Sequence, residues 1–227
     1  MGGRRRRAPV VVLATVAMTF VAGSGVATAA AAPTPDQLDA GLLTVDDLDT
    51  RTGFEEVDRR ELDAAALAAP DRGPCNGPNA PARAVEADPT VVLVTAAFGT
   101  DAGASLTQDV YSFANERQAK RFMARNAKQV RSCDEWDGQL QGAMRTYVVD
   151  SVTAEKLGDG AFVASAAVEP TTTGATGFDG ELIRETTYAR VGSVVMTLQF
   201  LRSVDYPSDT PGPGYPKRAV RTLAQAL

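Results

Sequence analysis

The chain has 227 residues, of which 44% are hydrophobic and 22% charged, and this balance is typical of a globular domain with a sizeable apolar core. Its formal charge of −5 argues against a nucleic-acid-binding role, for which a basic domain is expected. The sequence contains no histidine, which excludes serine or cysteine catalysis that depends on a histidine base.

The first residues, MGGRRRRAPV, and the uncharged stretch after them are typical of an export signal. Arg4 to Arg7 form a basic segment, residues 10–32 carry no charge, and Ala27-Thr28-Ala29 is a small-residue cleavage motif. We therefore expect a signal peptide at residues 1–29, a short tether at 30–35 and one secreted domain at 36–227. Because the uncharged run is long enough to cross a bilayer, retention as a membrane anchor is the alternative. Loss of the four arginines would lower the formal charge from −5 to −9.

Short elements are expected before the sheet begins. Residues 36–43 and 45–48 favour short helices, and Thr44 caps the second of them. Residues 54–59 favour a short strand and residues 61–69 an Ala-rich helix that ends at a proline. Residues 71–89 are rich in proline, glycine and asparagine, which predicts a surface loop around Cys75.

The strands of the sheet are predicted from apolar and alternating runs. These runs occupy residues 90–98, 105–113, 145–152, 161–168, 182–190 and 194–202. In the last run Val194, Met196, Leu198 and Phe200 share one face, which we expect to be the core face. The turn at residues 191–193 predicts a hairpin and therefore antiparallel pairing. Residues 217–227 predict a final amphipathic helix.

Residues 115–136 predict one long amphipathic helix against which the sheet packs. Ala119, Phe122, Met123, Val130 and Cys133 cluster on one side of its helical wheel. The opposite side is basic and carries Arg117, Lys120, Arg121, Arg125, Lys128 and Arg131. The order of helices and hairpins predicts an α+β fold class, with a twisted antiparallel sheet and helices packed on one face.

The two cysteines favour a single disulfide. An even number of cysteines in an exported chain is typical of an oxidised pair, here Cys75 with Cys133. Two separate thiols are the less favoured alternative. A metal site is not expected, because the sequence has no histidine and no second cysteine near either one.

Several short motifs resemble a known group of exported domains. They are L-L-T-x-D-D-L at 42–48 followed by Gly53-Phe54, a cysteine in a Pro/Asn-rich loop, V-Y-S-F at 110–113, an A-x-x-F helix at 119–122 that ends in Cys133, Leu-Gly-Asp at 157–159 and R-V-G-x-V-V at 190–195. This set resembles the exported sensor-type domains of actinobacteria, which include the extracellular C-terminal domain of a mycobacterial receptor Ser/Thr kinase, the PknH-like extracellular domain. The Mog1/PsbP-like lipoproteins of mycobacteria are a weaker match.

The resemblance implies a non-enzymatic extracytoplasmic domain with an α+β fold and a cleft for an unidentified ligand. Two departures matter. The kinase domain carries two disulfides whereas this chain can form only one, and this chain has no kinase or cytoplasmic part. The resemblance therefore implies binding of a small or polymeric envelope ligand, without a cofactor and without catalysis.

Two candidate binding features remain. Trp136, the only tryptophan, is a candidate ligand contact, although packing in the core is the commoner use of a single tryptophan. The basic side of the central helix, with Arg117, Arg121, Arg125 and Lys128, is a candidate surface for an acidic surface protein or polymer, and it makes a cell-surface interaction module the alternative function. Hydrolysis by the carboxylates around Trp136 (Asp134, Glu135 and Asp137) is a third hypothesis, against which solvated acidic turns are favoured.

Overall fold

The computed structural model describes residues 32–62, 80–140, 143–170, 181–205 and 210–227, which belong to one compact unit from Ala32 to Leu227. The expected signal peptide at 1–29, residues 71–79 of the expected loop around Cys75 and most of the expected helix at 61–69 lie outside the described residues. The rest of that expected loop is described, and the prediction is wrong there because residues 80–87 form a helix. No helix in the described part of the chain is long and apolar enough to cross a membrane.

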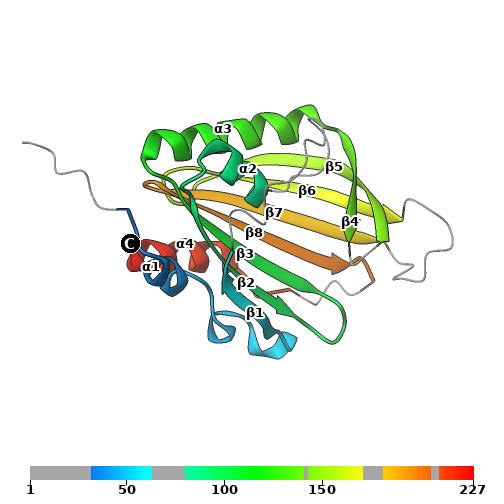
Figure 1. Ribbon diagram of the computed structural model, residues 1–227. Helices are drawn as coiled ribbons and strands as arrows, with labels where there is room; N and C mark the ends of the chain where they lie inside the picture. Colours follow the sequence, from blue (N-terminus) through cyan, green and yellow to red (C-terminus); the bar gives the residue numbers. More distant parts are fainter. Residues whose placement is uncertain (1–31, 63–79, 141–142, 171–180, 206–209) are drawn as a thin grey trace, which may run out of the picture. The chain divides into compact units, whose positions relative to one another are not determined.

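One antiparallel sheet of eight strands dominates the fold (Figure 1). Its spatial order is β1-β2-β3-β8-β7-β6-β5-β4, and every neighbouring pair is antiparallel. The strands are β1 (Glu55–Glu61), β2 (Val92–Gly99), β3 (Ser105–Ser112), β4 (Glu135–Leu140), β5 (Ala143–Glu155), β6 (Ala161–Pro170), β7 (Leu182–Val191) and β8 (Val194–Ser203). Seven of them follow the predicted runs, whereas β4 was not predicted.

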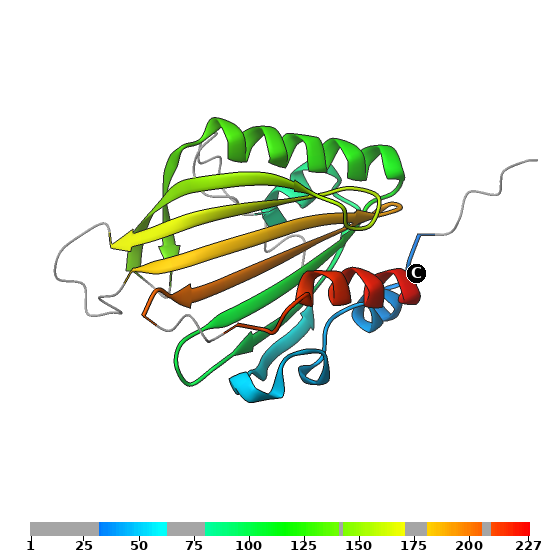
Figure 2. The same cartoon turned by 180° about the vertical axis from the view of Figure 1, so that it is seen from behind.

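Helices lie on both faces of this sheet, so the expectation of helices on one face is wrong. The helices are α1 (Pro35–Ala40), α2 (Ala80–Ala87), α3 (Glu116–Ser132) and α4 (Tyr215–Ala226), with the 3-10 turns η1 (Val45–Asp47) and η2 (Thr50–Thr52). Figure 1 shows α2 and α3 in front of the sheet, and Figure 2, from behind, shows α1 and α4 on the opposite face. Both faces are therefore covered, which is why residues of both alternation classes are buried in β3 and β8.

The face under α1 and α4, called the α1/α4 face from here on, holds the larger apolar cluster. Its members are Leu38, Leu42, Leu43, Leu48, Phe54, Val94, Ala96, Phe98, Ala104, Leu106, Val110, Leu157, Ala189, Val194, Met196, Leu198, Phe200, Tyr215, Ala219, Val220 and Leu223. The set includes the four predicted core residues of β8. A Cβ atom at Gly41 would lie 2.7 Å from Leu223 Cδ1 and 3.2 Å from its Cα, so a glycine is needed where α1 meets α4.

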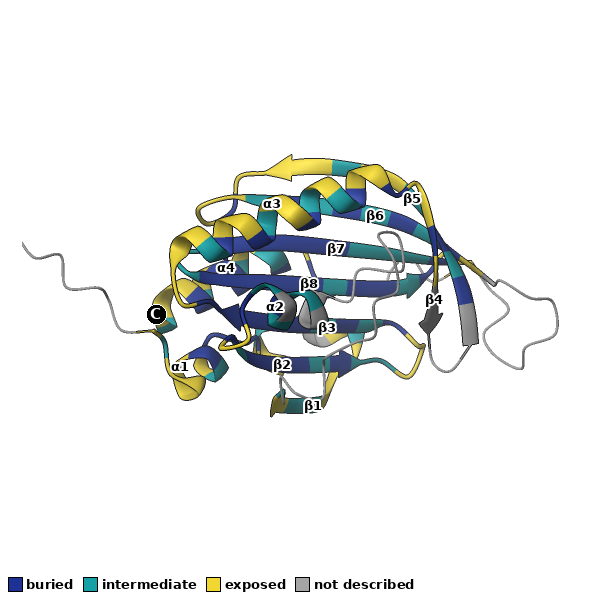
Figure 3. Cartoon of the chain, turned by 45° about the horizontal axis from the view of Figure 1, so that its top comes forward, coloured by how far each residue is buried: buried dark blue, intermediate teal, exposed yellow. Residues whose placement is uncertain are grey.

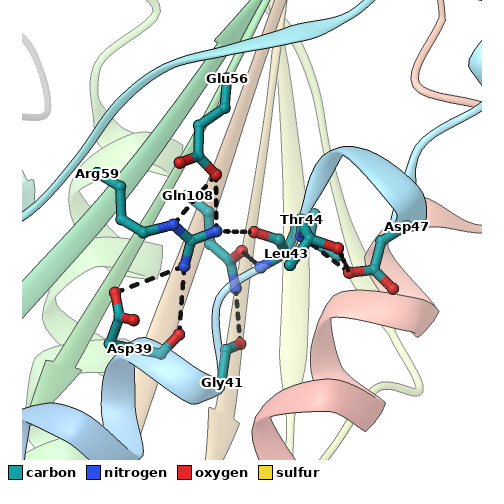
Figure 4. A network of polar contacts seen from close by, with 8 residues as sticks. All are labelled: Asp39, Gly41, Leu43, Thr44, Asp47, Glu56, Arg59 and Gln108. Atoms are coloured by element: carbon teal, nitrogen blue, oxygen red, sulfur yellow. Dashed lines mark hydrogen bonds and ion pairs between the residues drawn. The ribbon is translucent and has the colours of Figure 1, made fainter.

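Polar side chains on this face hold backbone groups of the segment after α1 (Figure 4). Gln108, which is fully buried in β3, accepts a hydrogen bond from Leu43 N at 2.6 Å and donates one to Gly41 O at 3.3 Å. Arg59 in β1 donates to Leu43 O and forms an ion pair with Glu56 at 2.9 Å. These contacts fix the segment between α1 and η1 against the sheet.

The opposite face, called the α2/α3 face, holds two smaller apolar clusters. One lies under α2 and α3 and contains Ala84, Val91, Leu93, Tyr111, Phe113, Ala119, Phe122, Val130, Phe162, Ala164, Tyr188 and Val195. The other lies toward β4 and contains Trp136, Tyr147, Ala166, Val168, Leu182 and Leu201. Figure 3 shows the buried side of α3 turned toward the sheet and its exposed side turned away from it.

Helix α3 is shorter than predicted. It begins after Asn115, whose side chain accepts a hydrogen bond from the backbone of Gln118 at the N-terminus. It ends at Ser132, because Cys133 adopts an extended conformation with φ −119° and ψ 96°. The chain then turns directly into β4, so Trp136 is a strand residue and not the last residue of the helix.

The predicted disulfide joins Cys133 to Cys75, which lies outside the described residues. Cys133, the only cysteine of the described residues, is disulfide-bonded and not a free thiol. The fold itself is a single eight-stranded antiparallel sheet with few helices. The physical basis of this fold is burial of apolar side chains on both faces of the sheet.

Candidate functional site

A patch of polar side chains lies on the α2/α3 face between the two apolar clusters. Thr95 of β2, Asp109 of β3 and Thr197 of β8 occupy directly paired positions on three adjacent strands. Gln199 is two residues beyond Thr197, and Arg184 of β7 donates a hydrogen bond to its Oε1. Because side chains alternate between the faces of a sheet, this register brings all five to one surface.

Asp109 is the centre of the patch. The residue is 4% exposed, and its carboxylate accepts a hydrogen bond from the Thr95 hydroxyl at 2.8 Å. It also accepts bonds from Thr197 Oγ1, Tyr111 Oη and Gln199 Nε2, each at 3.3 Å. A buried carboxylate needs partners of this kind to offset the loss of hydration.

Burial raises the pKa of Asp109 above the usual 3.8, although the four hydrogen bonds oppose this shift. Burial also raises the pKa of Tyr111 well above its usual value, and the neighbouring Asp109 carboxylate adds to that effect. The pKa of Tyr188 is raised by burial as well. The phenol of Tyr111 therefore stays protonated and can keep donating to Asp109.

Arg184 connects the patch to an aromatic surface. Its guanidinium carbon lies 5.3 Å from the centroid of the Tyr147 ring, within the range of a cation–π contact. Tyr147 in turn stacks on Trp136, with 5.2 Å between ring centroids and 5° between ring planes. Arg184 is only half-buried, whereas Trp136 and Tyr147 are buried. The guanidinium is thus the part of this group that a ligand can reach.

A small cavity of about 10 Å³ lies beside Arg184. It is lined by Val130, Trp136, Val149, Ala164, Ser165, Ala166, Arg184, Thr186 and Tyr188, so it lies between the C-terminal end of α3 and strands β4 to β7. This volume holds about one water molecule. A larger ligand would bind at the cavity with part of its surface outside, or would displace the C-terminal end of α3.

The predicted site residues are not brought together at one place. Trp136 lines the cavity, as a ligand contact would, while Arg117, Arg121, Arg125 and Lys128 are exposed on the side of α3 that faces away from the sheet. Figure 3 shows this exposed side of α3 in yellow. The two candidate features are therefore separate surfaces.

The acidic residues around Trp136 form no catalytic arrangement in the described residues. Asp134, Glu135 and Asp137 are exposed, and Asp137 accepts a hydrogen bond from Thr146 at 2.9 Å. Within the described residues no group of three or more histidine, cysteine, aspartate or glutamate side chains could hold a metal ion. Glu135 and Asp137 lie on the edge strand β4, so these carboxylates are solvated but do not form the expected acidic turn.

Sequence reasoning missed the polar patch. Asp109, Arg184 and Gln199 fall in predicted strands and were assigned no role in binding. The available signal was an aspartate in the middle of the strand SLTQDVYS, flanked by Gln108 and Val110. A charge at such a position is unusual for a strand next to the sheet centre.

Comparison with known proteins supports the fold. No protein-family model matches the sequence, and no curated protein matches it. The structure is similar to the extracellular domain of PknH from Mycobacterium tuberculosis, with a TM-score of 0.54, 10% sequence identity, and coverage of 86% of this chain and 96% of that chain. An uncharacterized protein from Mycobacterium smegmatis, an Rv0999 ortholog, aligns at a TM-score of 0.32 with 12% identity, covering 81% of this chain and 97% of that one.

The similarity to the PknH extracellular domain confirms, at the level of the fold, the resemblance inferred from the sequence motifs. At 10% identity it shows a shared fold and no more. The TM-score of the second structure is too low to support an inference. The binding properties of this chain must therefore be argued from its own residues.

Proposed function

We propose that the chain is a secreted, extracytoplasmic, sensor-like domain that binds a small ligand without catalysis, and that the ligand binds on the α2/α3 face at Arg184. The observation that carries the proposal is the placement of Arg184. A half-buried guanidinium lies at a cavity, beside a stacked aromatic pair, and is joined through Gln199 to a buried carboxylate. Ligand sites commonly combine apolar walls with a few convergent polar groups.

The chemistry of these residues favours an anionic ligand with a planar or apolar part. A guanidinium presents donors that match a carboxylate or phosphate group. Trp136, Val149 and Ala166 line the cavity next to it and offer an apolar surface. The bond from Arg184 to Gln199 holds the guanidinium in place before a ligand arrives, which lowers the entropy lost on binding.

The same residues favour binding over hydrolysis. Glycoside hydrolysis needs two carboxyl groups about 5 to 10 Å apart on either side of a bond. Among the described residues of the patch, Asp109 is the only carboxylate, and it is 4% exposed with four hydrogen-bond donors around it. Its place behind Gln199 and Arg184 suits a supporting role for the guanidinium.

A thermal-shift screen with small aromatic carboxylates and aryl phosphates would test the proposal on the mature protein. We expect at least one compound to raise Tm in the wild type and to lose most of that effect in Arg184→Gln. Arg202→Gln is the matched control, because Arg202 is also a half-buried arginine but lies on β8 with its side chain on the alternate face.

Two results would contradict the proposal. A compound that stabilises wild type and Arg184→Gln equally would place the ligand elsewhere. If the ligand-induced rise in Tm is lost in Arg202→Gln as fully as in Arg184→Gln, the ligand responds to positive charge in general and not to Arg184.

A further inference from the structure

A row of exposed cations follows the outer side of α3. We define the basic row as Arg117, Arg121, Arg125, Lys128 and Arg131, all of which are exposed. They are three or four residues apart in the sequence, so they lie on one side of the helix with a rise of about 4.5 to 6 Å between neighbours. The whole row extends for about 21 Å along the helix axis.

Within the described part of the chain, the basic row has no ion-pair partner. Among the described residues, no carboxylate lies within ion-pair distance of any of its five members. The nearest acid in the sequence, Glu116, is paired instead with Lys120 at 2.9 Å and with Arg190 at 3.6 Å. The cations are thus available to a partner, although the whole chain has a formal charge of −5.

This arrangement is unfavourable for an isolated helix. Like charges at spacings of three or four residues destabilise a helix. Arg117 is also in the first turn, where the helix dipole disfavours a cation. A bound anion would relieve both effects, and this is the electrostatic signature of a polyanion-binding surface.

The surface at the N-terminal half of the row is open and shallow. A space of about 710 Å³ over it is bordered by Asn115, Glu116, Arg117, Lys120, Arg121 and Ala124. The small side chain of Ala124 lies one turn after Lys120 and Arg121, so it leaves space for an anionic group next to these cations. Anionic groups can therefore approach the helix and contact more than one cation at a time.

Helix α3, all of which is described, exposes no large apolar side chain, and this distinguishes the partner. Helices that bind at a membrane surface insert apolar side chains into the lipid. In α3 the large apolar residues Phe122 and Val130 are buried against the sheet. The exposed large hydrophobic residues of the described chain are Val45, Val57, Val204 and Leu227, none of which is on α3. A straight row of cations without an apolar edge fits a linear polymer better than a bilayer.

We propose that the outer side of α3 binds a linear phosphate-bearing polymer, with the basic row following the polymer chain. Arginine is suited to this partner because its guanidinium can donate two parallel hydrogen bonds to one phosphate group. Four of the five residues in the row are arginines. This surface is distinct from the cavity at Arg184, so it goes beyond the proposed function and can be tested separately.

The test uses inorganic polyphosphate long enough to follow the whole row, with inorganic phosphate and vesicles of phosphatidylglycerol as the other two probes. Binding to the mature protein is measured by titration at several salt concentrations. We expect polyphosphate to bind and the logarithm of the association constant to fall with the logarithm of the salt concentration, because counterions are released. Inorganic phosphate and vesicles should bind far more weakly.

The double variant Arg121→Gln/Arg125→Gln should weaken polyphosphate binding and lower the magnitude of the salt slope by about 2, one for each lost phosphate contact. Lys217→Gln/Arg221→Gln is the matched control. It removes the same charge from exposed positions on α4 and should leave affinity and slope unchanged. Glutamine is a good helix former, so neither variant should disturb folding.

Three results would overturn the inference. Equal loss of binding in the two double variants would indicate attraction by net charge alone. Vesicle binding as strong as polyphosphate binding would assign the row to a lipid surface. The absence of polyphosphate binding at low salt would show that the basic row is a solvated helix face.

Discussion

Two consecutive buried side chains of β3, on opposite faces of the sheet, differ in what they bind. Gln108 and Asp109 are consecutive residues of β3, so they point to opposite faces. Gln108, on the α1/α4 face, bonds to the backbone groups of Leu43 and Gly41. Asp109, on the α2/α3 face, bonds to four side chains and none of its bonds fixes a backbone segment.

This difference separates structural support from binding. Backbone N–H and C=O groups that are buried on the α1/α4 face need hydrogen-bond partners for α1 and α4 to pack. Gln108 supplies such partners and therefore stabilises the fold. The side-chain network on the α2/α3 face ends at Arg184, a half-buried group that a ligand can reach. Changes on the first face should therefore affect stability, and changes on the second should affect binding more than stability.

The largest expected effect is on the α1/α4 face. Phe98 is 1% exposed in the main apolar cluster, and Phe98→Ala should lower the free energy of unfolding by about 3–5 kcal/mol because it leaves a cavity. Urea denaturation measures this loss. A loss below about 1 kcal/mol would show that the α1/α4 face is not the main source of stability.

A smaller loss is expected for Gln108→Leu. The substitution leaves the Leu43 amide and the Gly41 carbonyl without their buried partner, which should lower the free energy of unfolding by about 1–3 kcal/mol. Gln199→Leu is the comparison on the other face. It removes one of four donors to Asp109 and frees Arg184, so it should lower the free energy of unfolding less. The reverse order of the two losses would contradict the distinction between the faces.

The smallest expected effect is the change with pH that Asp109 causes in the free energy of unfolding. Because burial raises the pKa of Asp109 above 3.8, the folded state binds its proton more tightly than the unfolded state does. The stability contributed by this group is therefore lost as pH rises from about 4 through the folded pKa. Asp109→Asn cannot titrate, so the stability of the wild type relative to this variant should decrease over that range. A constant difference between the two unfolding curves would show that the pKa of Asp109 is not raised.

Much of the fold could be predicted from the sequence because alternation and apolar runs mark individual strands. The hairpin of β7 and β8 follows from its central turn, and Val194 to Phe200 show one core face. Burial of the second face could not be predicted, because Thr197 and Gln199 have the polarity of solvent-facing residues. The short strand β4 was missed because helix periodicity continues past Ser132, whereas the backbone becomes extended at Cys133.

The candidate site was harder to predict. Trp136 was singled out because it is the only tryptophan, and the cavity that it lines was not predictable because its walls come from four strands and a helix. Arg184 and Asp109 are separated by 75 positions in the sequence and are connected through Gln199. The basic row, by contrast, depends on helix periodicity alone, and all its members are exposed.

The most direct test of binding at the α2/α3 face is native mass spectrometry of the mature protein recovered from the medium of its own host, wild type beside Arg184→Gln. We predict an additional small mass on the wild type that is lost on denaturation and is absent from the variant. A wild-type protein without bound mass, or the same bound mass on both proteins, would contradict the account.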